Sequence, residues 1–169
     1  MADDSVFNEG LARGIVMIEK ATITIRTGSR GAESQSWAEM LWHMYLRWCE
    51  RHGYQKEITE FQEKEVGIEY ASIEVEGEGI RERLRSEDGV HRLVRISPHD
   101  SLGRRHTSFA SVRVAPRDES DNRDAWERQI RSYVFHPYIL VKDHQASIET
   151  TDIDAVLDGD IDRFHDEEL

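Results

Sequence analysis

Apolar positions between residues 33 and 52 recur at three- and four-residue steps, which is the spacing of one helical face. These positions are Trp37, Leu41, Met44, Tyr45, Trp48 and Cys49. Gly53 follows the last turn, and a glycine directly after a helical pattern is a typical stop signal. The pattern therefore predicts one long amphipathic helix over residues 33–52, with Trp42 on a different, partly exposed face.

Shorter runs rich in β-branched and aromatic residues surround this helix and predict strands. The predicted strands cover residues 21–26, 54–61, 68–75, 90–96 and 107–114. In the last run the two faces differ clearly, because Ala110, Val112 and Val114 alternate with Phe109, Ser111 and Arg113. One long helix among several strands predicts an α+β fold, in which a mostly antiparallel sheet packs on the helix.

The same patterns divide the chain into four parts. Residues 1–20 carry a weak helical rhythm, and residues 21–115 hold the long helix and the strands. Residues 116–129 begin with a polar, charged run that is typical of a linker. Residues 130–169 combine an apolar, aromatic run with a short helix at 152–157 that ends before Gly159.

Charge is distributed unevenly along the chain. The net charge is −12, which by itself argues against a phosphate-rich partner. Residues 81–113, however, contain eight arginines, no lysine and four acids. The planar guanidinium of arginine suits bidentate contacts with phosphates and base edges, so this block favours a local contact with RNA.

The residues offer little support for a membrane protein, a metal site or an enzyme. No apolar run approaches the roughly 20 residues of a membrane span, and the single Cys49 indicates a reducing compartment. The cytoplasm is expected, or an organelle stroma or matrix if a transit peptide has been removed. The spacing of His91, His99 and His106 fits no metal site, and no catalytic constellation stands out, so we expect no catalytic residue, metal or cofactor.

Three stretches share long, ordered motifs with a known family. The first, within residues 24–48, begins Thr-Ile-Arg-Thr-Gly-Ser-Arg-Gly. The second, within residues 89–112, contains Gly-Val-His-Arg-Leu-Val-Arg-Ile-Ser-Pro and Gly-Arg-Arg-His-Thr-Ser-Phe. The third includes Ile-Arg-Ser-Tyr-Val-Phe-His-Pro-Tyr at 130–138 and Ala-Val-Leu-Asp-Gly-Asp at 155–160. Together they resemble the fused codon-recognition and C-terminal domains of the bacterial type-2 class I peptide chain release factors.

One part of that family is missing between the second and third stretches. In the family a domain carrying Gly-Gly-Gln lies there, and it is needed to hydrolyse peptidyl-tRNA. In this chain the interval 116–129 is far too short to hold that domain, and no Gly-Gly pair occurs anywhere. The resemblance therefore implies a protein that is not an enzyme by itself, with residues 116–129 as a linker that replaces the catalytic domain.

The resemblance also assigns residues to RNA and codon binding. His106 and Thr107 match a histidine that stacks on a codon base and a threonine that helps to read the next base. Gly31 and Glu33 match the helix tip that faces the first codon base. Arg104 and Arg105 stand beside the matched histidine, where contacts with phosphate are expected.

The codon-reading motif departs from the family at several positions. Ser97, Pro98 and His99 stand where the family has Ser-Pro-Phe. Arg30 and Leu102 replace glycines close to RNA, where a bulkier residue can clash or add a phosphate contact. These changes weaken the expectation of strict stop-codon reading and leave docking near the decoding centre as the expectation.

The resemblance implies a monomeric, non-hydrolytic protein that binds the ribosomal A site, at the small-subunit decoding centre and its mRNA, or a related RNA. It would regulate translation or compete with release factors. Two alternatives remain open: a factor that has left the ribosome and stabilises a transcript, or the codon-reading half of a split enzyme with a separate Gly-Gly-Gln protein. An engineered deletion of an ordinary factor is a fourth explanation, which the altered tripeptide and Arg30 disfavour.

Overall fold

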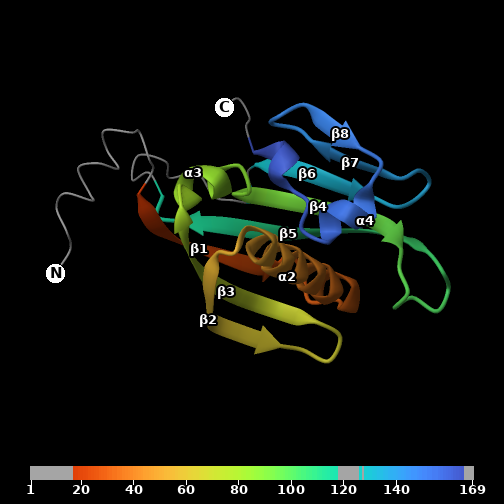
Figure 1. Ribbon diagram of the computed structural model, residues 1–169. Coiled ribbons are helices and arrows are strands. Elements are labelled where there is room, and N and C mark those ends of the chain that lie inside the picture. Colours follow the sequence, from red (N-terminus) through yellow and green to blue (C-terminus); the bar gives the residue numbers. More distant parts are fainter. Residues whose placement is uncertain (1–16, 118–125, 127, 166–169) are drawn as a thin grey trace, which may run out of the picture.

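The computed structural model describes residues 17–117, 126 and 128–165 of the chain. Figure 1 shows one twisted sheet with a long helix lying across one of its faces. The sheet has eight strands in the order β2-β3-β1-β5-β4-β6-β7-β8. Every neighbouring pair is antiparallel except β4 and β6, which run parallel. The predicted α+β fold with a mostly antiparallel sheet is confirmed.

The five predicted strands, the long helix and the short helix at 152–157 are present with small shifts at their ends, whereas the other elements were not predicted. The strands are β1 (Ile18–Thr27), β2 (Gln55–Glu63), β3 (Ile68–Glu78), β4 (Gly89–Ile96), β5 (Arg105–Ala115), β6 (Gln129–Val134), β7 (Leu140–Asp143) and β8 (Ile148–Thr150). The helices are α2 (Ala32–His52), α3 (Ile80–Arg85), α4 (Ile153–Leu157) and the 3-10 helix η2 (Asp162–Phe164). In the described part of the chain, no helix has the length and apolar character that would let it cross a membrane.

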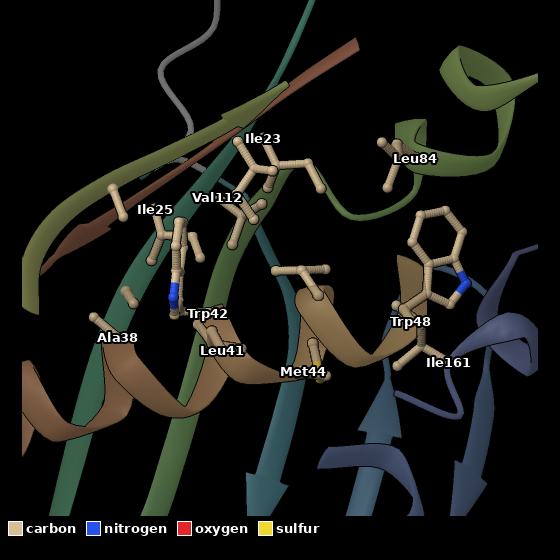
Figure 2. Close-up of a cluster of buried hydrophobic side chains, with 14 of the residues drawn as sticks. Ile23, Ile25, Ala38, Leu41, Trp42, Met44, Trp48, Leu84, Val112 and Ile161 are labelled. Carbon is tan, nitrogen blue, oxygen red and sulfur yellow. The ribbon is translucent and has the colours of Figure 1, made fainter. Parts of the chain in front are cut away.

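Helix α2 forms the centre of the core. Trp37, Leu41 and Trp48 are completely buried, as the helical spacing predicted. Figure 2 shows Leu41 on the side of α2 that faces Val112 of β5, whereas the sulfur of Met44 lies 4.0 Å from the Tyr133 hydroxyl of β6. Fully burying a large apolar side chain contributes roughly 1.5–3 kcal/mol, so this face anchors the helix to the sheet.

Two predictions were wrong in detail. Trp42 is only 4% exposed, because Phe61 of edge strand β2 packs on its ring with the centroids 5.3 Å apart. Ile18 to Lys20 belong to β1 rather than to an N-terminal helix, since they extend the ladder with β3 opposite Glu76 to Glu78. The rest of that predicted helix, residues 6–16, lies outside the described residues.

Glycines allow α2 to end and to be approached closely. Gly53 follows the helix with a φ of 70°, and its N–H donates to Glu50 O at 3.2 Å. At Gly67, in the β2–β3 turn, a side chain would lie 2.2 Å from the Gln35 carbonyl oxygen. The turn therefore packs directly on the backbone of the first turns of α2, which fixes the end of the helix that borders the candidate site.

A buried ionic cluster joins the start of β4 to β6 and β7. Arg131 and Glu87 are fully buried, and Asp143 is 1% exposed. The guanidinium of Arg131 donates to Glu87 Oε1 at 2.9 Å and Oε2 at 2.8 Å, and to Asp143 Oδ2 at 3.0 Å. Burial alone would raise the pKa of Glu87, but Arg131 and His165 hold it well below its ordinary value. The cluster is therefore charged in the folded state.

Helix α2 is tied into the same cluster by hydrogen bonds. The Tyr45 hydroxyl donates to Glu87 Oε1 at 2.8 Å, and Trp37 Nε1 donates to the His91 carbonyl at 3.0 Å. His91 Nε2 lies 2.9 Å from the Glu87 carbonyl, which can only accept, so Nε2 carries the proton. Nδ1 then accepts from the Tyr133 hydroxyl at 2.9 Å. Burial, together with the charge of Arg131, lowers the pKa of His91 to about 4.

We expect the neutral His91 to make the stability pH-dependent. The unfolded chain protonates this histidine near its ordinary pKa of about 6.5, whereas the folded chain resists protonation down to about 4. Unfolding is therefore favoured as the pH falls through this window, and the free energy of unfolding should drop by about 1.4 kcal/mol per pH unit.

Urea unfolding of wild type and of His91→Gln between about pH 5 and 7 measures this slope. Glutamine keeps a donor for the Glu87 carbonyl and cannot titrate. The variant should therefore have a lower free energy of unfolding at pH 7, and this free energy should fall less than that of wild type as the pH is lowered. His43→Gln, at an exposed position of α2, is the matched control and should behave as wild type. Equal slopes of the free energy of unfolding against pH in wild type and His91→Gln would contradict a neutral His91 in the folded state.

Candidate nucleic-acid interface

A surface depression of about 400 Å³ lies between the N-terminus of α2 and the loop that connects β4 to β5. We call it the tip pocket. Figure 1 shows this loop extending past the sheet at the same end as the start of α2. Seven of the ten predicted RNA-binding residues line the pocket, namely Gly31, Glu33, Ser97, His99, Arg104, His106 and Thr107. The fold thus brings together two stretches that are more than 60 positions apart in the sequence.

The other three predicted residues lie around the pocket. Pro98 and Arg105 are exposed on the loop and at the start of β5. Arg30 lines an adjacent depression of about 240 Å³ together with Arg26 and Glu69. These three residues therefore border the tip pocket without forming its walls.

Glu33 fixes the loop to the helix. Its side chain is 8% exposed and accepts from Arg95 Nε at 2.6 Å and from Arg95 Nη2 at 2.9 Å. The Ser97 hydroxyl donates to Glu33 Oε1 at 2.8 Å. Burial alone would raise the pKa of Glu33, but the hydrogen bonds from Arg95 and Ser97 lower it. The carboxylate is thus charged and directed into the protein, where it positions the loop.

Ser97 extends the hydrogen bonds of Glu33 into the loop. While its hydroxyl donates to Glu33, the same oxygen accepts the His99 N–H at 3.1 Å. The loop is closed at its base by the Ser97 N–H, which donates to the Arg104 carbonyl at 3.2 Å. The first and third residues of the altered tripeptide are therefore held in a turn, and His99 is exposed at its surface.

Asp100 is the central acceptor of the loop. One carboxylate oxygen accepts from the Leu102 N–H at 2.9 Å, and the other accepts from Arg104 Nε at 2.7 Å and contacts His106 Nε2 at 2.8 Å. The hydrogen bonds from Arg104 and His106 hold the pKa of Asp100 well below its ordinary value. Asp100 therefore sets the orientation of two residues that the resemblance assigns to RNA.

The sequence contained only an indirect signal for Asp100, as one of four acids in the arginine-rich block. A loop has no periodicity from which a pairing with Arg104 or His106 can be read. Arg95 was missed for the same reason: it belongs to a predicted strand, and its partner Glu33 is 62 positions away. These ion pairs cancel charge inside the site, whereas Arg105 forms no ion pair within the ranges that the structure describes.

The remaining reactive groups do not converge on the tip pocket. Cys49 is buried in the core, and burial raises its pKa to about 11, so it is a thiol rather than a nucleophilic thiolate. Over residues 17–117, 126 and 128–165, no three His, Cys, Asp or Glu side chains gather as metal ligands do. The pocket is a polar surface lined by hydroxyls, histidines and one arginine, which suits recognition of a polar polymer.

Known proteins match both the sequence and the fold. The PCRF domain family matches residues 17–112. Peptide chain release factor 2 of Thermotoga petrophila is 35% identical over 235 residues, covering 88% of this chain and 64% of the relative. Peptide chain release factor 2 of Clostridium perfringens is 32% identical over 230 residues, covering 85% of this chain and 64% of the relative. The chain thus spans 64% of the length of these curated relatives, and the 235-residue alignment with the first exceeds the 169 residues present here.

The fold agrees with a solved structure of the same kind. Release factor 2 of Thermus thermophilus superposes with a TM-score of 0.77 at 28% sequence identity, covering 96% of this chain and 70% of that chain. The match includes the C-terminal strands, which the family match over residues 17–112 does not reach. The chain therefore belongs to the PCRF domain family.

Proposed function

We propose that this chain is a non-hydrolytic member of its family that docks the tip pocket on the mRNA codon in the ribosomal A site. The observation that carries the proposal is the tip pocket itself, in which the helix tip at Gly31 and Glu33 meets His106 and Thr107. Docking there would occupy the small-subunit decoding centre and compete with complete release factors. The protein would act as a monomer in the cytoplasm, or in an organelle stroma or matrix.

Local electrostatics support RNA binding by an acidic chain. Inside the site, Glu33 is matched by Arg95 and Asp100 by Arg104, so neither carboxylate presents unbalanced negative charge to a ligand. Around the rim, Arg30 and Arg105 form no ion pair within the described part of the chain. The rim is therefore locally positive although the whole chain carries −12, which allows phosphate contacts at the rim and base contacts inside.

The absence of peptidyl-tRNA hydrolysis is supported by the way β5 connects to β6. The two strands flank β4, and the Val90 N–H donates to the Arg128 carbonyl at 2.6 Å. The connection between Ala115 and Gln129 has to cross one strand only, and it contains no Gly-Gly pair. The chain thus offers no internal segment that could reach from the decoding centre to the peptidyl-transferase centre.

The first prediction concerns catalysis. The purified chain should release no formyl-methionine from ribosomes programmed with a stop codon, because it brings no group to the reacting ester. An excess of chain should instead slow release by a complete release factor, since both would occupy the A site. Rates of release at increasing chain concentration measure both effects. Stop-dependent release by the chain alone would refute the non-hydrolytic role, and an unchanged rate with the complete factor would refute docking.

The second prediction concerns phosphate contacts. Arg105→Ala should weaken ribosome binding and reduce the slope of log affinity against log salt by about 0.7, the value for one contact with a single strand. Arg85→Ala is the matched control, because Arg85 is 74% exposed on α3, at the opposite end of the sheet. Binding measured at several salt concentrations decides it. Identical slopes for both variants would mean that Arg105 does not contact RNA.

The third prediction concerns codon reading. If His106 stacks on a base, His106→Ala should cost roughly 1–3 kcal/mol of affinity. Asp100→Asn removes the charge that holds Arg104 and His106, so affinity for all A-site codons should rise while the difference between codons shrinks. Asp154→Asn, exposed on α4, is the control. Equal affinity for all codons in wild type, unaffected by His106→Ala, would show that the lobe docks without reading bases.

A further inference from the structure

Two arginines line the smaller depression that lies beside the tip pocket. It has a volume of about 240 Å³ and is lined by Arg26, Thr27, Gly28, Ser29, Arg30 and Glu69. We call it the arginine hollow. Its lining comes from the end of β1, the turn that leads to α2 and the start of β3, whereas the tip pocket takes its lining from β5. Because β3 and β5 flank β1 in the sheet, the two sites lie on opposite sides of the turn and meet at Ser29, which lines both.

Arg26 is held in place by Tyr70. The two residues lie opposite each other in the β1–β3 ladder, and the guanidinium carbon of Arg26 lies 4.3 Å from the centre of the Tyr70 ring. The Tyr70 hydroxyl donates to Glu60 Oε1 at 3.0 Å, which fixes the ring. A guanidinium that stacks on an aromatic ring keeps the N–H groups at its edge for an acceptor. Among the described residues Arg26 finds no such acceptor and no ion-pair partner, so its N–H groups are available to a ligand.

Arg30 brings a second guanidinium to the hollow. Its backbone is fixed, because its carbonyl accepts from Gln35 Nε2 at 3.0 Å. Its side chain is exposed and has no hydrogen bond or ion pair with any residue that the structure describes. The hollow therefore contains two arginines whose donors are not used inside the protein.

The one carboxylate that lines the hollow is paired with a different residue. Glu69 Oε1 lies 3.6 Å from the Nζ atom of Lys64, so neither arginine is neutralised by it. Two arginines, one glutamate and one lysine give this region a charge of +2. Two like charges that share one hollow repel each other, and an anion bound between them would remove this repulsion.

The peptide dipoles of α2 add to this positive charge. The helix is 21 residues long, and its N-cap residue, Gly31, has no side chain that could cap the first N–H groups. The N-terminus of a helix carries a partial positive charge, which favours an anion close to it. The helix and the two arginines therefore make this side of the α2 tip positive in a chain whose net charge is −12.

We propose that the arginine hollow binds one backbone phosphate of RNA between Arg26 and Arg30. This inference rests on the proposed function, because it requires the chain to dock at the ribosomal A site. A phosphodiester carries one negative charge and accepts hydrogen bonds in the bidentate geometry that a guanidinium offers. The phosphate belongs either to the mRNA next to the codon or to the rRNA around it. The α2 tip is then held on both sides, by the codon in the tip pocket and by the phosphate in the arginine hollow.

The salt dependence of binding to small ribosomal subunits programmed with mRNA tests the site. The double variant Arg26→Gln with Arg30→Gln should bind about tenfold more weakly, the lower end for hydrogen bonds to a charged group. Its slope of log affinity against log salt should be smaller by roughly 0.7–0.9, the range for one phosphate contact. The control, Arg83→Gln with Arg85→Gln, removes two exposed arginines of α3 at the opposite end of the sheet and changes the net charge equally. It should match wild type in affinity and in slope.

Methylphosphonate linkages in the mRNA identify the source of the phosphate. Such a linkage is uncharged, so replacing the linkages in and beside the A-site codon one at a time removes one mRNA phosphate each time. If the bound phosphate belongs to the mRNA, one replacement should weaken binding of wild type about tenfold and leave the double variant unchanged. If every replacement affects both proteins equally, the phosphate belongs to rRNA.

The outcomes separate this inference from the proposed function. Equal affinity and equal salt slope for wild type and the double variant would overturn the inference and leave docking on the ribosome intact. A slope reduced by about 1.4 or more would mean that the arginines contact separate phosphates, which overturns the shared site. An equal loss in the α3 control would attribute the effect to net charge and likewise overturn it. Absence of binding by wild type would overturn both proposals, and circular dichroism of each variant shows whether a loss of binding is a loss of fold.

Discussion

The buried guanidinium of Arg131 is the interaction on which the rest of the structure depends. It is held between Glu87, which precedes β4, and Asp143, which ends β7. An unpaired buried charge costs several kcal/mol, so each member is tolerable only when the others are in place. This requirement links three segments that no local pattern connects. Arg131 lies in β6, opposite His91 of β4, and its ion pair with Glu87 therefore also holds the parallel strands β4 and β6 together.

The same cluster sets the geometry of the distant tip pocket. Tyr45 and Trp37 attach α2 to the Glu87 carboxylate and to the His91 carbonyl, which fixes the helix against the start of β4. At the first turn of α2 and just past the end of β4, Glu33 meets Arg95 and Ser97. A helix and a strand that are fastened at two places act as a rigid frame, and the loop that carries His106 is built on that frame.

Within the loop, the charged side chains hold the conformation of the loop and do not serve to attract a ligand. The carboxylate of Asp100 is occupied by hydrogen bonds to Arg104, His106 and the Leu102 N–H, and the carboxylate of Glu33 is likewise occupied by Arg95. What remains for a ligand is a surface of hydroxyls, imidazole rings and rim arginines. Such a surface favours stacking and hydrogen bonding over general attraction to phosphate, which agrees with a chain whose net charge is −12.

The sequence by itself determined the elements whose signal is local. The buried face of α2, its end at Gly53 and the alternation along β5 follow from side-chain periodicity and from the conformational freedom of glycine. The residues of the tip pocket came from the resemblance, because no periodicity links the α2 tip to a loop more than 60 positions later. Only the tertiary structure decided the burial of Trp42 under Phe61, the pairing of Asp100 and the cluster around Arg131. Each of these depends on which distant or loop residues become neighbours, and that is settled by packing rather than by local pattern.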